Sequence, residues 1–291
     1  MSGWTAADLP SFAGRTVVVT GANSGLGEVT ARELARVGAK VIMAVRNTTK
    51  GDQAAAGMTG DVEVRKLDLQ DLASVREFAD GFGPADTIDV LVNNAGIMAV
   101  PYAQTVDGFE SQIGTNHLGH FALTNQLLPK ITDRVVTVSS LMHLFGYISL
   151  KDLNWKSRPY LAWPAYGQSK LANLLFSKEL QRRLTAAGSP VKAHSAHPGY
   201  SATNLQGHTG NRISDRAVKT VNKVVTDADF GARQTLYAVA ADLPGDSFVG
   251  PRFGIWGPTR PAPRSPLARD TKKAEALWEL SEQLTGTGFA L

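Results

Sequence analysis

The sequence predicts an α/β fold, a single doubly wound domain with a mostly parallel, seven-stranded sheet and helices on both faces. Short β-branched runs alternate along the chain with longer segments of helical period. That alternation is typical of βαβ units, which build parallel sheets covered on both faces. The 291 residues contain no internal repeat and no linker between two halves, so residues 1–291 are expected to form one domain.

Each element has a local reason. Residues 15–20 (RTVVVT) form a β-branched run, which favours a buried strand. Residues 25–37 place apolar side chains on one helical face, and Gly38 follows as a stop signal. The other strands are expected at 40–46, 62–69, 88–93, 134–140, 191–196 and 247–256, the last an edge or broken strand because of Pro251. The other helices are expected after Asp71 and at 106–128, 166–184, 227–241 and 267–284, with 251–266 as a surface loop and about 258–291 as a C-terminal extension.

Composition excludes several classes of protein. Hydrophobic residues make up 43% and charged residues 19%, which is too apolar for disorder and too poorly charged for a coiled coil. A net charge of +4, spread along the chain, does not argue for a nucleic-acid partner. The chain has no cysteine, so disulfides and cysteine nucleophiles are excluded, and no histidine–carboxylate spacing predicts a metal site. No apolar run approaches the roughly 20 residues of a membrane span, so we expect no membrane span and a cytoplasmic location.

A glycine-rich turn follows the first expected strand and opens the first helix. It reads Thr20-Gly21-Ala22-Asn23-Ser24-Gly25-Leu26-Gly27. Gly21 permits a tight turn, Gly25 lets the backbone approach a pyrophosphate, and Gly27 lets the helix pack close to the sheet. The helix N-terminus then presents free N–H groups to phosphate. A lone glycine pattern is a weak signal, but a strand before it and a helix after it favour nucleotide binding.

The TGxxxGxG spacing resembles the short-chain dehydrogenase/reductase family. Asn93-Asn94-Ala95-Gly96 after the fourth strand is similar to that family's NNAG element, and His197-Pro198-Gly199 to its Pro-Gly after the sixth strand. The resemblance implies a Rossmann fold. It also implies cofactor contacts from the glycine turn (Gly21, Asn23, Ser24, Gly25, Leu26, Gly27) and from Asp68, Leu69, Asn93, Ala95, Gly96, Tyr166, Lys170, Pro198, Gly199 and Thr203.

The end of the second strand predicts which nicotinamide cofactor is used. A carboxylate at this point binds the ribose 2′-hydroxyl of NAD and would repel a 2′-phosphate. The strand here ends Ala44-Val45-Arg46-Asn47, without an acid. Arg46 offers a permanently charged donor fork that suits phosphate. The sequence therefore favours NADP(H) over NAD(H), with Lys50 as a further cation. The alternative is that Arg46 is an ordinary solvated arginine on the surface.

Tyr166-Gly167-Gln168-Ser169-Lys170 is the most specific chemical signal. Tyr166 and Lys170 are four residues apart on one helix face, where the ammonium and the positive nicotinamide of an oxidised cofactor are expected to lower the pKa of the phenol. Ser140 ends the fifth strand, where its hydroxyl can bond a substrate oxygen. The resemblance implies that Tyr166 moves the proton and that Asn116 helps to hold a proton-relaying water. Ser139 is expected to face the other way, and His143, His194 and His197 are interpreted as structural, His143 alone near substrate.

These residues predict an NADP(H)-dependent oxidoreductase that interconverts an aldehyde or ketone and an alcohol. The alternatives are a non-catalytic NADP-binding regulatory protein and a nucleotide-sugar epimerase, whose members usually carry TGxxGxxG and a longer substrate domain. The long stretch between Ser140 and Tyr166, and Leu277–Ser281 near the end, are similar to the retinol dehydrogenase, WW-domain oxidoreductase and protochlorophyllide reductase branch.

The substrate is expected to be small and apolar, because the candidate pocket residues are mostly apolar. They are Ile97, Met98, Leu141, Met142, Phe145, Trp155, Trp163 and Tyr200, with the loop at about 200–226. The insert between Ser140 and Tyr166 is expected to fold back over its own subunit, so that its two tryptophans shape the pocket. A monomer or weak homodimer follows from that arrangement.

Overall fold

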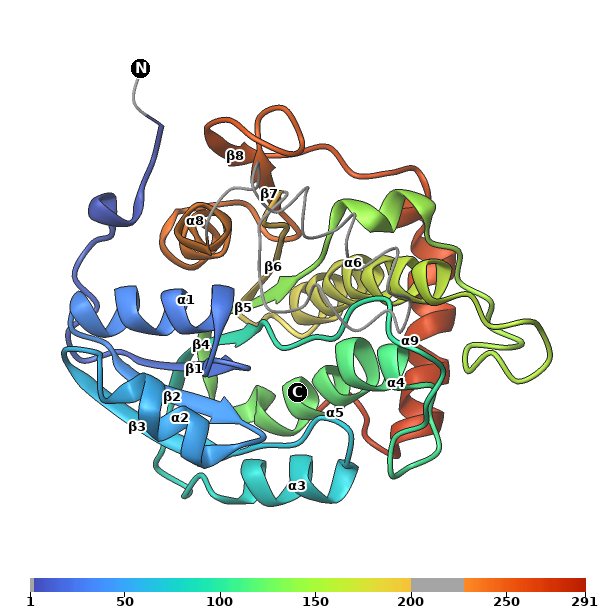
Figure 1. Ribbon diagram of the computed structural model, residues 1–291, viewed down its shortest axis with the longest axis horizontal. Coiled ribbons are helices and arrows are strands. Elements are labelled where there is room, and N and C mark those ends of the chain that lie inside the picture. Colours follow the sequence, from blue (N-terminus) through green and yellow to red (C-terminus); the bar gives the residue numbers. More distant parts are fainter. Residues whose placement is uncertain (1–2, 200–227) are drawn as a thin grey trace.

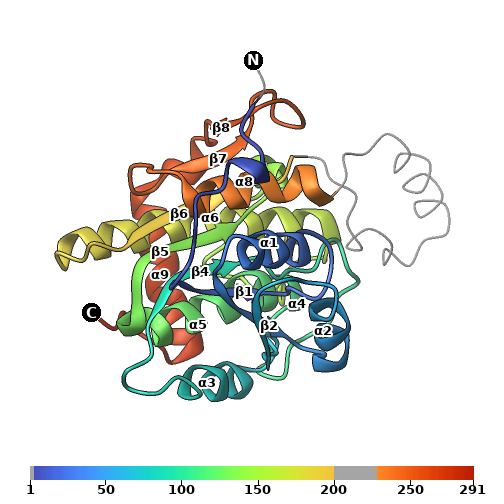
Figure 2. The same ribbon diagram turned by 90° about the vertical axis from the view of Figure 1, so that its left-hand side faces the viewer.

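The computed structural model describes residues 3–199 and 228–291. One eight-stranded sheet runs through it in the order β3-β2-β1-β4-β5-β6-β7-β8 (Figures 1 and 2). The strands span Thr16–Thr20 (β1), Lys40–Val45 (β2), Asp61–Lys66 (β3), Ile88–Asn93 (β4), Ile131–Val138 (β5), Lys192–Ala196 (β6), Phe248–Pro251 (β7) and Thr259–Pro261 (β8). Every neighbouring pair is parallel except β7 with β8. The doubly wound α/β fold is confirmed.

Helices cover both faces of the sheet. They span Gly25–Arg36 (α1), Thr48–Ala55 (α2), Leu72–Asp80 (α3), Ser111–Ile113 (α4), Gly119–Leu127 (α5), Ala162–Ala186 (α6), Ala228–Ala240 (α8) and Thr271–Thr285 (α9). One apolar core joins the sheet to α3, α5, α6 and α9, and the other joins it to α1 and α8. Alternate strand residues, such as Val17 and Val18 of β1, enter the two cores. None of the helices in the described part of the chain has the length and apolar character that a membrane crossing requires.

The seven-strand expectation is wrong by one strand. Residues 247–256 were expected to hold one strand, but β7 ends at Pro251 and the chain turns back into β8. Pro251 has no N–H with which to continue a ladder. Gly254 and Gly257 have φ of 80° and 109°, which allows the reversal. The stretch 251–266 is therefore part hairpin and not wholly loop.

Several helices also differ from the sequence expectation, among them α9, which begins at Thr271 after a separate 3₁₀ turn at Leu267–Arg269. The helix expected from residue 106 begins at Ser111, because the carboxylate of Glu110 caps it by accepting from the N–H groups of Gln112 and Ile113. Between α4 and α5 the chain forms a π-helical turn, Gly114–Leu118. The short helix α2 was not predicted, and α6 begins four residues earlier than the predicted start, at Ala162.

Candidate active site

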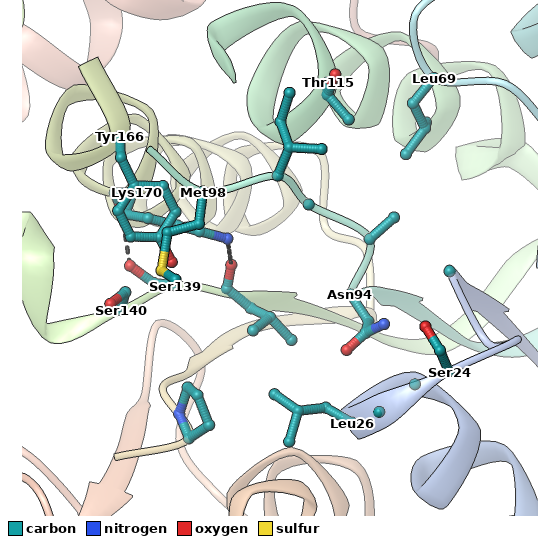
Figure 3. A pocket seen from close by; sticks show the side chains of 18 of the residues that line it. Ser24, Leu26, Leu69, Asn94, Met98, Thr115, Ser139, Ser140, Tyr166 and Lys170 are labelled. Atoms are coloured by element: carbon teal, nitrogen blue, oxygen red, sulfur yellow. Dashed lines mark hydrogen bonds between the residues drawn. The ribbon is translucent and has the colours of Figure 1, made fainter. Parts of the chain in front are cut away.

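A cavity of about 650 Å³ opens at the carboxyl ends of the parallel strands. One end lies over the glycine turn with Ser24 and Asn94, and the other holds Ser140, Tyr166 and Lys170 (Figure 3). Its lining includes these residues predicted from the sequence: Gly21, Asn23, Ser24, Gly25, Leu26, Gly27, Arg46, Asp68, Leu69, Ala95, Gly96, Ser140, Tyr166, Lys170, Pro198 and Gly199. Thr203 lies outside the described residues.

The glycine turn has the shape that a pyrophosphate needs. Gly21 has a φ of 65°, and a Cβ there would lie 3.0 Å from the Cα of Ala95. A Cβ on Gly27 would lie 2.5 Å from the carbonyl oxygen of Gly21, so the helix touches the turn. Ser24 starts α1 without a side-chain capping bond, which leaves the N–H groups of the first turn free for an anion. These residues fit a dinucleotide phosphate.

The glycine turn is held in place by hydrogen bonds of Thr20 and His120, which the sequence analysis did not predict. Thr20 Oγ1 accepts from the backbone N–H groups of Asn94 and Ala95, both at 2.9 Å, and lies 2.9 Å from His120 Nε2. His120 Nδ1 lies 3.1 Å from the Asn116 carbonyl. Burial lowers the pKa of His120 to about 3, so the ring is neutral and donates through Nδ1 while Nε2 accepts from Thr20.

Asn93 lies differently from its neighbour. Its side chain is 1% exposed and donates to Thr124 Oγ1 at 2.8 Å, away from the cavity. Asn94 lines the cavity instead and donates from Nδ2 to the Thr20 carbonyl at 2.8 Å. The period-2 alternation of a strand places neighbouring side chains on opposite faces, which was the signal available in the sequence.

Two cations line the cavity beyond β2. Arg46 follows the strand, and Lys50 lies in the first turn of α2. The side chain of Asn47 caps that helix by accepting from the Lys50 N–H at 3.0 Å. Among the described residues, neither cation has an ion-pair partner. The strand end thus combines two unpaired positive charges with a helix N-terminus.

Ser140, Tyr166 and Lys170 meet at the other end of the cavity. Lys170 Nζ donates to the Val138 carbonyl at 3.1 Å and lies 5.7 Å from the Tyr166 ring centroid. The Tyr166 hydroxyl is hydrogen-bonded to the Ser140 side chain. Tyr166 is 6% exposed and Lys170 is 4% exposed, although both line the cavity. A phenol, a hydroxyl and an amine therefore face one small volume (Figure 3).

The expected lowering of the tyrosine pKa is wrong for the chain by itself. Burial raises the pKa of Tyr166 to about 12, and the hydrogen bond from Ser140 only partly opposes that rise. Burial also lowers the pKa of Lys170 to about 8. Desolvation of the buried phenol is the largest cause of the rise in its pKa. At neutral pH the phenol is therefore protonated and able to donate.

Asn116 lies in the π-helical turn and is fully buried. Its Oδ1 accepts from the Ile97 N–H at 2.8 Å, and its Nδ2 donates to the Ile97 carbonyl at 2.9 Å and to Ser169 Oγ at 2.8 Å. The side chain thus clamps Ile97, a cavity residue, to the helix that carries Tyr166. All of these hydrogen bonds of the Asn116 side chain are therefore made to other residues of the chain.

Ser139 and the three histidines have structural surroundings. Ser139 Oγ donates to the Lys170 carbonyl at 2.7 Å, which braces α6 against β5. His143 Nδ1 lies 2.7 Å from the Ser140 carbonyl, and its Nε2 accepts from the Ser265 N–H at 3.4 Å. His194 and His197 are at most 1% exposed, and burial lowers the pKa of each to about 4.

The substrate end of the cavity includes most of the apolar residues expected there. The lining residues are Ile97, Met98, Leu141, Met142 and Trp163. Phe145 does not line it and is 74% exposed. Trp155 does not line it either, because Arg158 stacks over its ring at 3.6 Å and Tyr160 packs edge-on at 5.7 Å. The prediction that both tryptophans shape the pocket is thus wrong for Trp155. Tyr200 and the expected substrate loop lie outside the described residues.

A buried polar network behind the substrate end was also missed. Gln112 accepts from the Ala99 N–H at 2.8 Å and donates to the Ala162 carbonyl at 2.9 Å and to the Tyr160 hydroxyl at 2.7 Å. The Tyr160 hydroxyl lies 3.2 Å from Glu110. Burial raises the pKa of Glu110. Gln112 therefore joins the cavity wall at Ala99 to the start of the helix that carries Tyr166.

The cavity runs from a phosphate-binding type of glycine turn to a serine, a tyrosine and a lysine. On an α/β fold, this combination is typical of a nicotinamide-dependent oxidoreductase. The short chain dehydrogenase family model matches residues 15–213. Human retinol dehydrogenase 13 is 43% identical, with 94% of this chain and 85% of that protein covered. The chain belongs to the short-chain dehydrogenase/reductase family and is related to retinol dehydrogenases.

Solved structures agree with that membership. A crystal structure of an uncharacterised protein from Mycobacterium paratuberculosis is 68% identical, covers 100% of both chains and superposes with a TM-score of 0.89. A structure from Beutenbergia cavernae, described as a putative NAD(P)-dependent gluconate 5-dehydrogenase with NADP bound at low occupancy, is 25% identical. It covers 82% of this chain and 96% of its own, with a TM-score of 0.63.

Proposed function

We propose that this protein is an NADP(H)-dependent oxidoreductase that interconverts a carbonyl compound and an alcohol on a small apolar substrate. The observation that carries the proposal is the convergence of Ser140, Tyr166 and Lys170 at the far end of a cavity that begins at a phosphate-shaped glycine turn. A non-catalytic NADP-binding protein needs only the glycine turn, so this convergence favours an enzyme.

Tyr166, Ser140 and Lys170 have different roles in the proposed proton transfer. A bound nicotinamide dinucleotide supplies or accepts the hydride. Tyr166 holds a proton at its hydroxyl and gives it to the carbonyl oxygen during reduction. The Ser140 hydroxyl donates a hydrogen bond to that oxygen as negative charge develops there. Lys170 carries a positive charge below about pH 8 and favours the phenolate that Tyr166 becomes.

Asn116 acts in this proposal as a positioning residue. It holds Ile97 and Ser169 by direct hydrogen bonds, so the cavity wall and the helix of Tyr166 keep a fixed separation. The remaining predicted contacts, from Asp68 and Leu69 at one end to Pro198 and Gly199 at the other, would hold the dinucleotide along the cavity.

The preference for NADP(H) rests on Arg46. Its unpaired guanidinium, with Lys50 nearby, suits a 2′-phosphate, and the strand end offers no carboxylate to a ribose hydroxyl. The related Beutenbergia structure holds NADP. Arg46→Ala is expected to weaken NADPH binding by about 1.5–3 kcal/mol, the worth of a charged hydrogen bond, and to leave NADH binding nearly unchanged. Fluorescence titration with both cofactors measures this, and an equal loss for the two would show that Arg46 only supports the fold.

The substrate class rests on the apolar side chains at the catalytic end, Ile97, Met98, Leu141, Met142 and Trp163. Relatives named retinol dehydrogenases support an apolar alcohol or aldehyde. The test is a panel of aldehydes and ketones of increasing apolar size, including a retinoid, followed by NADPH absorbance. Turnover of apolar but not polar members is expected, and turnover of none would favour the non-catalytic alternative. A cytoplasmic location and a monomeric or weakly dimeric state stay predictions from the sequence.

A further inference from the structure

Three large apolar side chains protrude from the loop that joins β7 to β8. Phe253, Ile255 and Trp256 are 54%, 49% and 57% exposed. Phe253 and Trp256 pack against each other with their ring centroids 4.5 Å apart. Isolated apolar residues on a surface are ordinary, but a cluster of three with two aromatic rings is typical of an interaction site. We call residues 252–257 the aromatic loop.

The aromatic loop borders the catalytic end of the cavity. Gly199 lines the cavity, and a Cβ on it would lie 2.7 Å from the Ile255 carbonyl oxygen. A Cβ on Gly254 would lie 3.8 Å from the side chain of Leu141, another cavity residue. The hairpin that carries the loop stands at one edge of the sheet (Figure 2). Whatever the aromatic loop binds is therefore held beside the cavity wall.

Basic residues predominate along the chain within and just after the aromatic loop. The segment 252–273 contains one acidic residue, Asp270, against these basic residues: Arg252, Arg260, Arg264, Arg269, Lys272 and Lys273. Arg264 is paired with Asp246. Arg252, Arg260 and Arg269 are exposed and form no ion pair with any residue in the described ranges. The Arg252 guanidinium lies 5.5 Å from the Phe253 ring centroid, so positive charge flanks the apolar cluster directly.

We propose that the aromatic loop is a docking surface for an anionic phospholipid bilayer. Tryptophan and phenylalanine are favoured at the bilayer interface, and exposed arginines are attracted to anionic headgroups. A second copy of the chain fits less well, because a two-fold contact would bring two cationic edges together. Docking in this way sets the catalytic end of the cavity against a phase in which apolar compounds dissolve. That consequence rests on the proposed function, but the bilayer contact does not.

The test is sedimentation of the full chain with vesicles of phosphatidylcholine, without or with phosphatidylglycerol. We expect the bound fraction to rise with phosphatidylglycerol and to fall with added salt. The double variant Phe253→Ser/Trp256→Ser should bind at least about tenfold more weakly, because it loses two apolar side chains from the contact. Arg252→Gln/Arg260→Gln should lose the dependence on phosphatidylglycerol. Val106→Ser is the matched control, since Val106 is 79% exposed near β3 at the opposite edge of the sheet.

Brominated lipid gives an independent measurement. It should quench part of the tryptophan fluorescence of the vesicle-bound protein, and Trp256→Phe should bind normally but lose most of that quenching. The proposal is overturned if the unaltered chain does not sediment with anionic vesicles at low salt. It is equally overturned if the Phe253→Ser/Trp256→Ser variant binds these vesicles as tightly as the unaltered chain. It is also overturned if light scattering shows a dimer that the Phe253→Ser/Trp256→Ser variant does not form. Vesicle binding is measured without cofactor or substrate, so an active enzyme that ignores vesicles refutes only this inference, and an inactive chain that binds them refutes only the proposed function.

Discussion

Replacing Tyr166 with phenylalanine removes one hydroxyl and leaves the ring in its buried place. The side chain is 6% exposed, so its packing is retained, and the loss is confined to the hydrogen bond with Ser140. Burial raises the pKa of Tyr166 to about 12, which makes the phenol a reservoir of one proton throughout the neutral range. The variant therefore separates proton donation from binding.

The expected loss follows from that role. General acid catalysis contributes typically about 10²–10⁴-fold, so kcat for carbonyl reduction should fall at least about 100-fold. That factor corresponds to about 2.7 kcal/mol of activation free energy. The free energy of unfolding should change by only about 1 kcal/mol, the worth of one hydrogen bond. NADPH consumption gives kcat, fluorescence titration gives the NADPH dissociation constant, and urea unfolding gives stability.

Tyr160→Phe is the matched control. Its hydroxyl is also hydrogen-bonded, to the Val100 carbonyl at 3.0 Å, and the residue is half-buried, but it does not line the cavity. This variant removes the hydrogen bonds with the Val100 carbonyl and Gln112, so it should lose about 1–3 kcal/mol of stability while keeping most of its kcat. The assignment of Tyr166 as the acid fails if Tyr166→Phe keeps more than about a hundredth of the activity, the limit that a roughly 100-fold contribution of general acid catalysis sets. It fails equally if Tyr160→Phe loses as much activity as Tyr166→Phe.

Three other predictions concern charge, support and shape. Lys170 is protonated below its pKa of about 8 and loses its charge as the pH rises through that value, so the reductive kcat/KM should decline on the alkaline side. If the reductive kcat/KM stays constant up to pH 10, where the Lys170 side chain is neutral, the positive charge of Lys170 has no part in catalysis. Gln112→Ala leaves the buried Ala99 N–H unpaired and should lower the free energy of unfolding in urea by about 1–3 kcal/mol. An unchanged urea midpoint would show that water replaces it. Gly27→Ala puts a Cβ 2.5 Å from the Gly21 carbonyl and should abolish NADPH binding in a titration, whereas Gly57→Ala, with its nearest neighbour at 3.7 Å, should not. Equal affinities in the two would refute the close-approach argument.

The parts of the fold that local pattern controls were predictable. The strands β1, β2 and β4 lie within a residue of their expected bounds, because long β-branched runs leave little choice of element. The glycine turn and the pairing of Tyr166 with Lys170 were equally local, since spacing along one turn or one helix fixes them. The structure brings both to the same cavity, as the order of elements implied.

The parts that failed depend on contacts between distant segments. Strand β8 exists because residues 259–261 pair with β7, and three residues carry no strand signal of their own. Burial of Trp155 depends on Arg158 and Tyr160, which its apolar character alone could not reveal. The pKa of Tyr166 depends on how fully the folded chain excludes water from it, a quantity that no motif encodes.

The segment between Ser140 and Tyr166 is tied to the catalytic helix at both of its ends. Gly146 touches the backbone of Gly167 so closely that neither position has room for a side chain. Gln168 donates to the Leu153 carbonyl at 2.8 Å and accepts from Arg158 at 2.7 Å. Between these ties, Ile148 is 2% exposed and belongs to the apolar core, and Asp152 pairs with Arg158, so both side chains are part of the support. Only the exposed side chains there, those of Tyr147 and Lys151, are positions at which evolution or an engineer can alter the outer surface without retuning proton transfer.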